Sequence, residues 1–448
     1  MIATRILPSN QELLSPDTSL PEGWEFSTLG EIGDYINGRA FKSSDWSDKG
    51  RPIIRIQDLT GSKSNPNYYD GQIEDCYIVC PGDLLISWSA TLGVFLWKGP
   101  VGVLNQHIFK VDSYIDKIFH RWLVHYILDK LYAETHGSGM VHITKGKFVT
   151  TLVPLPPLAE QERIGAKLEE LLARVNATKE RLSKVSIILK RFRQAVLAAA
   201  CSGRLTTDWR EKMNVASEEY QNLTMADIGM VSGGITKNSK RESLPMQVPY
   251  LRVANVYENL IDLKDVREIG ITHQEFERTI LKRGDILIVE GNGSLDQIGR
   301  VAIWEEQVKP CVHQNHLIKF RVSELVVPRY ALFWLMSPLG RECLMEAAVS
   351  TAGLHNLSIS KIEKLPISVP GISEQSEIVR RVEAMFKLAD AVEKRVEAAK
   401  VRAEKLTQAI LAKAFRGELV PTEAELARRE GRTYESVSEL LAKIKSNR

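Results

Sequence analysis

The chain has 448 residues, of which 44% are hydrophobic and 26% are charged, and its formal net charge at pH 7 is +3. A chain of this length can form two or three domains with cores of their own. The near-neutral charge neither requires nor excludes a nucleic-acid partner. Without a run of 18 apolar residues, no membrane span is expected.

The expected compartment follows from the N-terminus and the cysteines. The N-terminal residues are polar and lack the apolar segment of a signal peptide. The five cysteines are an odd number without a repeated spacing. Reduced thiols in a cytoplasmic protein are therefore expected.

Residues 1–21 form an N-terminal segment, and residues 22–153 are predicted to form a first globular domain. Runs of β-branched and aromatic residues between turn signals predict strands at Pro52–Ile56, Leu84–Trp88 and Val94–Trp97. Ile118–Tyr132 is predicted to be helical. Together these elements indicate a mixed α/β domain.

Residues 154–218 are predicted to form a long helical spacer. Apolar residues alternate there by four and three, with only Thr178 breaking the stripe, which is typical of a coiled coil. The predicted seam is Ile164, Leu168, Leu171, Val175, Leu182, Val185, Leu189, Phe192 and Val196.

Residues 219–367 are predicted to form a second mixed α/β domain, with strands at Ile286–Glu290 and Arg300–Trp304 and a helix at Pro328–Leu335. A second helical spacer follows at 368–420. Its predicted seam is Ile378, Val382, Met385, Ala389, Val392, Val396, Ala399, Ala403, Leu406 and Ile410. The tail at 421–448 has short helical stretches at Glu423–Arg429 and Val437–Lys445, without an assigned role.

The two halves of the chain repeat each other. When the sequence is shifted by 214 positions, residues 156–205 fall on residues 370–419 without a gap, and 14 of the 50 pairs are identical. Unrelated sequences would give about three. Such a repeat implies two copies of one structural unit, related by an approximate two-fold axis.

The globular domains share only short landmarks. The matching segments are Ile32-Gly33 with Ile228-Gly229, 52–55 with 249–252, 81–86 with 283–288, and 105–110 with 314–319. Between them the offset drifts from 196 to 214, so the loops differ. A shared scaffold with divergent loops is expected of two related binding domains that take different ligands.

The partner of each seam is predicted to be the other spacer, packed antiparallel, because a two-fold axis reverses the helix direction. One symmetric register pairs Val185 with Ala389, Val175 with Ala399 and Leu171 with Ala403, although sequence does not fix the register. The alternative is a rod that joins separate chains. The predicted fold class is therefore α+β, with two mixed α/β domains separated by two long helices that form an antiparallel coiled coil.

A search for catalytic and metal-binding motifs finds no convincing site. No Gly-x-Gly-x-x-Gly opens a helix after a strand, and the fragment Lys145–Phe148 lacks the remaining residues of a phosphate-binding loop. Cys311, His313 and His316 have plausible ligand spacing, but strand alternation would send the two histidines to opposite faces. We expect no bound metal and a binding protein rather than an enzyme.

Several motifs resemble those of the specificity subunit of type I restriction-modification enzymes. The resemblance rests on 155–161 and 189–197 in the first copy, on 374–383 and 410–419 in the second, and on Leu20–Trp24 before the first domain. It covers nearly the whole chain. The helical motifs are specific in combination, whereas the globular domains match in layout and landmarks.

The resemblance implies two target-recognition domains that each read one half of a bipartite, asymmetric double-stranded DNA target. A spacer of roughly 60 Å would exceed one B-DNA turn of about 34 Å. Catalysis would belong to partners, namely two methylation subunits that use S-adenosylmethionine and restriction subunits that use ATP and Mg²⁺. The methylation subunits would dock on the helices, where Arg181 and Arg395 are candidates for contact.

The resemblance also suggests which side chains contact DNA, since Arg, Lys, Asn and Gln suit phosphates and base edges. The first-domain candidates are Arg39, Lys42, Arg55, Gln57, Lys63, Trp88, Thr91, Lys145 and Lys147. The second-domain candidates are Lys237, Lys240, Arg241, Arg252, Asn255, Asn292, Ser294 and Gln297. Arg55 and Arg252 have an alternative structural interpretation, because both copies keep them.

Three other interpretations stay open at this point. The chain could be a self-contained methyltransferase or nuclease with unrecognised motifs, or an adaptor whose domains bind proteins. It could also serve a system that only methylates DNA. Binding of S-adenosylmethionine and salt-dependent DNA affinity would discriminate between the first two and the main hypothesis.

Overall fold

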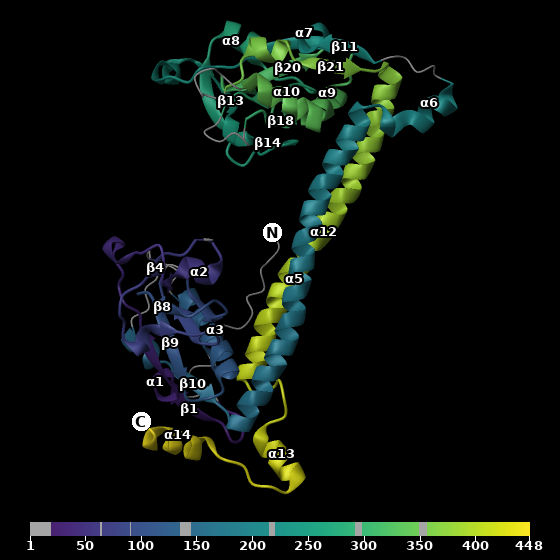
Figure 1. Cartoon of the computed structure of the whole chain (residues 1–448). Coiled ribbons are helices and arrows are strands. Elements are labelled where there is room, and N and C mark those ends of the chain that lie inside the picture. Colours follow the sequence, from purple (N-terminus) through teal and green to yellow (C-terminus); the bar gives the residue numbers. More distant parts are fainter. Residues whose placement is uncertain are drawn as a thin grey trace. The chain divides into compact units, whose positions relative to one another are not determined.

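A computed structural model describes residues 19–62, 65–89, 91–134, 145–214, 220–291, 298–348 and 356–448. The chain divides into two compact units, Met1–Arg181 with Ala399–Arg448 (unit 1) and Leu182–Ala398 (unit 2). Each unit holds one globular domain and a section of each of two long helices, α5 and α12 (Figure 1). Among the described residues, no helix is long and apolar enough to cross a membrane.

The domain of unit 1 is built on two four-stranded sheets. One has the antiparallel order β2-β9-β6-β7, and the other has the order β4-β3-β8-β5, in which β3 and β8 are parallel. β1 and β10 pair separately. The strands are β1 (Glu25–Thr28), β2 (Gly33–Asn37), β3 (Arg51–Ile54), β4 (Tyr68–Tyr69), β5 (Ile78–Val79), β6 (Leu84–Ser87), β7 (Gly93–Leu96), β8 (Gly102–Leu104), β9 (Ile108–Ser113) and β10 (Leu152–Leu155).

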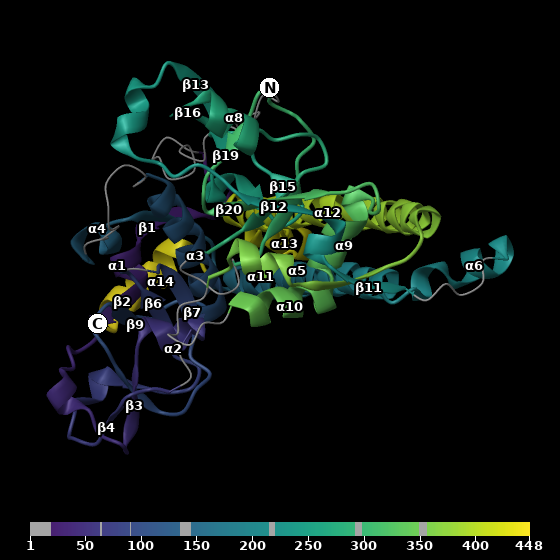
Figure 2. The same cartoon turned by 90° about the horizontal axis from the view of Figure 1, so that it is seen from above.

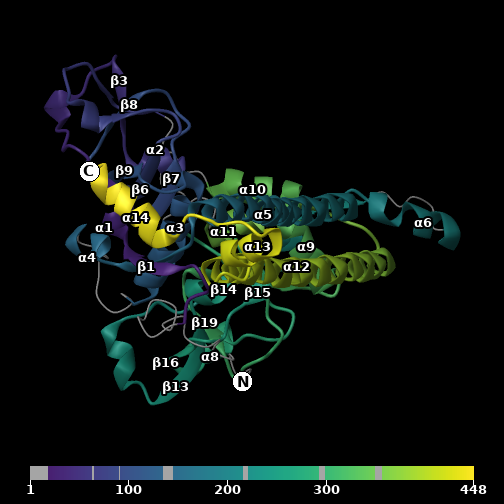
Figure 3. The same cartoon turned by 90° about the horizontal axis from the view of Figure 1, so that it is seen from below.

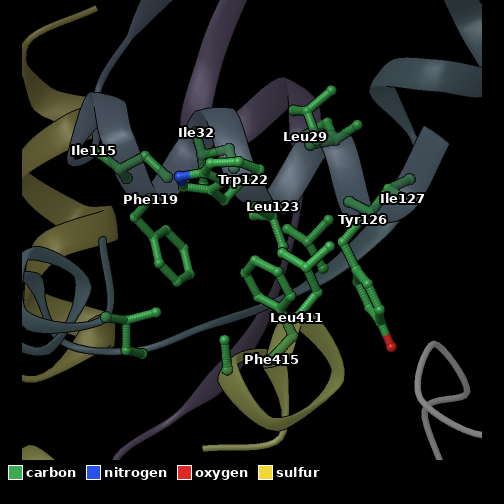
Figure 4. Packing of buried hydrophobic residues seen from close by; sticks show 14 of the residues in the cluster. Leu29, Ile32, Ile115, Phe119, Trp122, Leu123, Tyr126, Ile127, Leu411 and Phe415 are labelled. Carbon is green, nitrogen blue, oxygen red and sulfur yellow. The ribbon is translucent and has the colours of Figure 1, made fainter. Parts of the chain in front are cut away.

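Helix α3 (Lys117–Glu134) joins this domain to the long helices, and α1 (Leu29–Ile32), α2 (Ile56–Thr60) and α4 (Lys145–Val149) are short. Figure 4 shows the core at the junction, where Phe119 and Tyr126 of α3 face Phe415 at the end of α12. Their ring centroids lie 5.7 and 5.0 Å from that of Phe415. Gly165 of α5 allows the close approach of α3, because an added Cβ would lie 3.3 Å from the Phe119 amide nitrogen.

The domain of unit 2 repeats this topology. Its antiparallel sheet β12-β20-β17-β18 has the same order of equivalent strands, and β13 pairs in parallel with β19 as β3 does with β8. The strands are β11 (Gln221–Thr224), β12 (Gly229–Gly233), β13 (Met246–Leu251), β14 (Val256–Tyr257), β15 (Leu260–Ile261), β16 (Arg267–Ile271), β17 (Ile286–Val289), β18 (Val301–Ile303), β19 (Val312–His313), β20 (Leu317–Val322) and β21 (Pro366–Val369). The predicted repeat of the domain is confirmed.

Two helices take the place of α3 in unit 2. They are α9 (Pro328–Met336) and α10 (Pro338–Ala348), which lie side by side in Figure 2. Phe333 of α9 meets Phe386 of α12 with ring centroids 5.8 Å apart. The remaining helices of this unit are α6 (Thr207–Met213), α7 (Met225–Ile228), α8 (His273–Thr279) and α11 (Ile359–Glu363).

The two spacers are single helices of 44 residues each, α5 (Leu158–Cys201) and α12 (Ile372–Phe415). Gly203 and Gly417, with φ of 74° and 73°, follow their C-termini in the left-handed conformation that commonly ends a helix. Val196 and Leu197 share a core cluster with Ile378 and Val382 in unit 2, which confirms the antiparallel pairing of the spacers.

The symmetric register that pairs Val185 with Ala389 is not the one that the helices adopt. That register would put Arg193 opposite residue 381, about 13 Å along the helix from Asp390. In the structure, Arg193 Nη2 lies 2.6 Å from Asp390 Oδ1 and 2.8 Å from Glu393 Oε2. The two helices are therefore shifted along each other relative to that register.

The seam prediction was right for most positions and wrong at the same places in both copies. Leu172 and Phe386 are buried, whereas the predicted Leu171 and Met385 are only partly so. Phe192 and Leu406, predicted inside the seam, are 36% and 52% exposed. The physical reason is that each helix of a pair can cover only one narrow stripe of its partner. Along the C-terminal part of α12, burial recurs once every seven residues, at Ala389, Val396, Ala403 and Ile410.

A glutamate and a glutamine anchor each domain to its long helix. Glu160 accepts hydrogen bonds from Trp24 Nε1 at 2.9 Å and from the Glu423 amide at 2.7 Å. Glu374, at the equivalent position, accepts from Thr206 Oγ1 at 2.6 Å and Tyr220 Oη at 2.9 Å, and pairs with Arg210. Burial raises the pKa of Glu160.

The neighbouring glutamines make identical contacts. Gln161 Nε2 donates to Pro156 O and Gln375 Nε2 donates to Pro370 O, both at 2.8 Å. Their side-chain carbonyl oxygens accept hydrogen bonds from the backbone amides of Asp116 and Val327, the residues directly before α3 and α9. The Glu-Gln repeat in the sequence is therefore a structural anchor.

The C-terminal tail packs against the first domain, within unit 1. Its predicted helices are confirmed as α13 (Glu423–Glu430) and α14 (Val437–Ser446). Val437, Leu440 and Ile444 of α14 are buried in the core of unit 1, and Figure 3 shows α14 beside α1. Arg163 Nη1 of α5 lies 2.6 Å from Glu423 Oε2.

Candidate nucleic-acid interface

The landmarks shared by the two domains are structural. Gly82 and Gly284 both have φ of 91°, and their amides donate to Trp97 O and Trp304 O. The following Asp83 and Asp285 accept the backbone amide three residues earlier, at 2.8 and 2.7 Å. These turns fix the start of β6 and β17 in each sheet.

The lysines of the shared strands are also structural. Lys110 Nζ donates to Ile78 O at 2.9 Å, and Lys319 Nζ donates to the equivalent Ile280 O at 3.3 Å. Lys319 is 2% exposed, and burial lowers its pKa to about 8. These contacts give the shared turns and lysines a structural role.

Arg55 and Arg252 occupy equivalent positions but have different surroundings. Each backbone amide donates to the side chain three residues on, Asp58 or Asn255, at 2.9 Å. The Arg55 guanidinium then lies over the exposed Trp46 ring, 4.9 Å from its centroid. Arg252 instead pairs with Asp265 at 2.7 Å. The position is therefore structural in its backbone and differs in what its side chain presents.

Arg39 packs against two neighbouring rings of the first domain. Its guanidinium carbon lies 5.3 Å from the Phe41 ring and 5.4 Å from the Tyr69 ring, and Nη1 donates to Tyr69 Oη at 3.2 Å. A guanidinium held in this way is oriented before any ligand arrives. Arg39 and Arg55 are thus two arginines presented on aromatic faces, a feature that sequence spacing could not reveal.

The other first-domain candidates are spread over several elements. Lys42 and Gln57 are exposed, the latter on α2, and Lys145 and Lys147 are exposed on α4. Trp88 follows β6 and is half-buried, and the Thr91 carbonyl accepts the Ser87 hydroxyl at 2.5 Å. Lys63 lies outside the described residues.

Two second-domain candidates have structural roles. Arg241 forms a bidentate pair with Glu275, at 3.1 and 2.7 Å, and also donates to Thr236 O and Gly270 O. Asn255 is 3% exposed, and its amide nitrogen donates to Asp262 O and Asp265 O. The prediction that Asn255 contacts DNA is corrected, because its buried side chain is hydrogen-bonded to the backbone of the surrounding turn.

Lys237 and Lys240 are exposed around the short turn after β12, as a phosphate contact requires. The predicted base-reading residues Asn292, Ser294 and Gln297 lie outside the described part of the chain. Glu290, which directly follows β17, and Gly291 are the described residues before that loop.

Cys311, His313 and His316, considered above as metal ligands, each contact a different part of the domain. Cys311 Sγ lies 3.6 Å from Val312 O, and His313 Nδ1 lies 2.9 Å from Leu317 O inside the core. His316 is exposed and faces Glu290. Within the described ranges, no cluster of three or more His, Cys, Asp or Glu side chains is arranged to hold a metal ion.

Comparison with known proteins identifies the family. The model of the type I restriction modification DNA specificity domain matches residues 21–186 and again 217–400. The chain belongs to this family. Each match covers one globular domain and part of the long helix that follows it. The internal repeat of this chain therefore coincides with two copies of the family's domain.

Full-length relatives support the same assignment. The specificity subunit of the type I restriction enzyme EcoBI from Escherichia coli is 34% identical over 420 residues, which cover 90% of this chain and 87% of that protein. The EcoKI specificity subunit from Escherichia coli strain K12 is 31% identical over 424 residues, covering 89% and 90%. The chain is therefore a specificity subunit of a type I restriction-modification system, with two recognition domains.

A solved structure shares the fold. A chain from a study of complex assembly and conformational transition of the type I R-M system superimposes with a TM-score of 0.67 and 19% identity, over 90% of this chain and 100% of that one. At this identity the likeness concerns the fold.

Proposed function

We propose that this specificity subunit reads an asymmetric, bipartite double-stranded DNA target, one half-site for each recognition domain. The observation that carries the proposal is the pair of domains itself. They share turns, lysines that donate to backbone carbonyls, and strand order, yet equivalent backbone positions present different side chains. Where the first domain has Arg39 against two aromatic rings, the second has the buried Ile235, and both positions form the equivalent parallel bridge. Two scaffolds with different surfaces suit two different half-sites.

Positive charge supports DNA as the ligand. Arg39 and Arg55 are oriented on aromatic faces in the first domain, and Lys145 and Lys147 are exposed on α4 of the same domain. The second domain has exposed Lys237 and Lys240. Arginines held in a fixed orientation are suited to base edges and phosphates, whereas exposed lysines suit phosphates alone.

The same proposal includes two methylation subunits, one docked on each copy of the long helix. Exposed apolar residues recur on the two helices at equivalent positions. Ile187 and Phe192 of α5 are 56% and 36% exposed, and their equivalents Val401 and Leu406 of α12 are 43% and 52% exposed. Exposed apolar side chains repeated in this way suit two copies of one partner. Arg181 and Arg395 are exposed on the same helices.

Catalysis belongs to the partners in this proposal. The methylation subunits bind S-adenosylmethionine, and restriction subunits that join through them use ATP and Mg²⁺. The complex works in the cytoplasm, and the five free thiols of this chain suit that compartment. This chain contributes sequence recognition and no chemical step.

The decisive test is a genome-wide map of N6-methyladenine in cells that lack the endogenous system. The cells would express this chain with its neighbouring methylation subunit, and control cells would express each alone. A split, asymmetric motif is expected only when both are present. If the two proteins co-purify and no motif appears, the proposal fails and the adaptor alternative gains support.

The docking surface has its own test. Phe192→Ser with Leu406→Ser should prevent co-purification of the methylation subunit, while each single variant should retain one copy of it. Leu260→Ser is the matched control, because Leu260 is 59% exposed on β15 of the second recognition domain. Unchanged stoichiometry in the double variant would remove this surface from the proposal.

A further inference from the structure

Three backbone positions at the strand ends are equivalent in the two domains. The Trp88 amide donates to His107 O at 3.2 Å, and the Glu290 amide donates to His316 O at 3.0 Å. Trp88 follows β6 and Glu290 follows the equivalent β17, while Asn37 and Gly233 end the equivalent strands β2 and β12. We call Asn37, Trp88 and His107 the first strand-end group, and Gly233, Glu290 and His316 the second strand-end group.

The first strand-end group presents hydrogen-bond donors. Trp88 Nε1 donates to Asn37 Oδ1 at 3.2 Å. Because an indole N–H can only donate, the Asn37 amide must turn its oxygen to Trp88 and its NH₂ away from it. Asn37 is exposed, so this NH₂ is accessible to a ligand that carries acceptors.

Packing holds this arrangement in place. The Trp88 ring lies 5.7 Å from the Phe109 ring in a stacked geometry and 5.1 Å from the His107 ring at an angle of 61°. His107 has φ of 74°, an uncommon conformation for a residue with a side chain. Such conformations are concentrated at functional sites. Lys145 lines the same groove as Asn37, which puts a cationic side chain beside the group.

The second strand-end group presents an acceptor. Glu290 Oε2 lies 3.3 Å from His316 Nδ1, and since a carboxylate can only accept, the imidazole donates here. The Glu290 carboxylate has a second oxygen, and its side chain is 22% exposed. Gly233 leaves the place of Asn37 without a side chain, and the exposed Arg278 donates to its carbonyl at 3.1 Å. A cation therefore accompanies each strand-end group.

We infer that the two strand-end groups are specificity-determining and have opposite hydrogen-bonding polarity; this inference rests on the proposed function. Asn37 reads an acceptor on a base edge, which in the major groove means a purine N7 or the oxygen of guanine or thymine. Glu290 reads the exocyclic amine of cytosine or adenine. Trp88 is a positioning residue, because its N–H occupies the oxygen that asparagine otherwise uses in a bidentate contact with adenine.

The test is selection from randomised duplex DNA by the complex of the full chain with its methylation subunit. Asn37→Asp exchanges the donor for an acceptor at constant shape, so one position of one half-site should change from an acceptor-bearing base to an amine-bearing one. Glu290→Gln should lower the preference at one position of the other half-site by about tenfold. Trp88→Phe keeps an aromatic ring but removes the indole N–H, which frees the Asn37 oxygen. The base position that changes in Asn37→Asp should then also accept adenine.

Matched controls lie at the opposite ends of β9 and β20, the strands that begin directly after His107 and His316. Asp112→Asn on β9 and Glu324→Gln beyond β20 are exposed and should leave both half-sites unchanged. Co-purification with the methylation subunit shows that each variant is folded. A split motif that is identical in wild type and in all three variants would overturn this inference and leave the proposed function standing. A wild-type complex that selects no motif would overturn both.

Discussion

Where each recognition domain meets the long helices, the two copies use the same residues for the same contacts. Gln161 and Gln375 each donate to a proline carbonyl at 2.8 Å, and Glu160 and Glu374 each collect donors from the chain segments around them. At the strand ends the backbone contacts are still shared, but Trp88 is replaced by Glu290 and Asn37 by Gly233. The comparison teaches that the two copies keep the contacts that hold the scaffold together and differ in the side chains that they present at the strand ends.

The largest effect is expected from a charged side chain introduced into the buried junction between the first domain and the long helices. Leu168 is fully buried in the core of unit 1. Leu168→Glu should lower the free energy of unfolding by more than about 4 kcal/mol, because the site offers no compensation for a buried carboxylate. Urea denaturation followed by circular dichroism would measure it. A loss as small as that of the exposed control Ala166→Glu would contradict the assigned junction.

The glutamate anchors test whether the two copies are energetically alike. Glu374→Ala would leave the buried donors of Thr206 and Tyr220 without their acceptor, and Glu160→Ala would do the same to Trp24. Each should lose about 3 kcal/mol of unfolding free energy. Glu404→Gln, exposed on α12, is the control and should lose less than about 0.5 kcal/mol. Strongly unequal losses at Glu160 and Glu374 would show that only one copy depends on its anchor.

The tail distinguishes the copies, because α14 closes only the first domain. A chain that ends before Val437 would expose the core covered by Val437, Leu440 and Ile444. Removal of three buried aliphatic side chains should cost a few kcal/mol in unit 1. Hydrogen exchange should then rise in β1 and α1 and remain unchanged in β12 and β20. Equal protection in both domains would mean that the tail is not needed for closure.

The smallest effect concerns a contact found in the second domain. Arg241 lowers the pKa of Glu275 to about 2 through its hydrogen bonds. Because the pKa in the folded state lies below the ordinary value, the contribution to stability is complete above pH about 4.5 and is lost as the pH falls toward 2. Urea midpoints between pH 2 and 6 should therefore decline less in Glu275→Gln than in wild type. Glu268→Gln, exposed on β16, should follow the wild-type curve.

Sequence by itself determined the repeat, the two long helices, their antiparallel pairing and most of the buried stripe, because these depend on periodicity and on identities at a constant offset. It also located the scaffold landmarks. It could not separate structural from ligand-facing polar residues. Asn255 and Arg241 look like ligand contacts in a polar loop, and only the folded chain brings Asp265 and Glu275 to them.

Tertiary structure alone decided the register of the helices, the exposure of Phe192 and Leu406, and the strand-end groups. Each depends on contacts between residues far apart in the chain, such as Arg193 with Asp390 and Trp88 with Asn37. A local pattern records which side chains are apolar, but not which partner covers them. The orientation of the Asn37 amide follows from a donor 51 residues away, and no spacing rule contains that information.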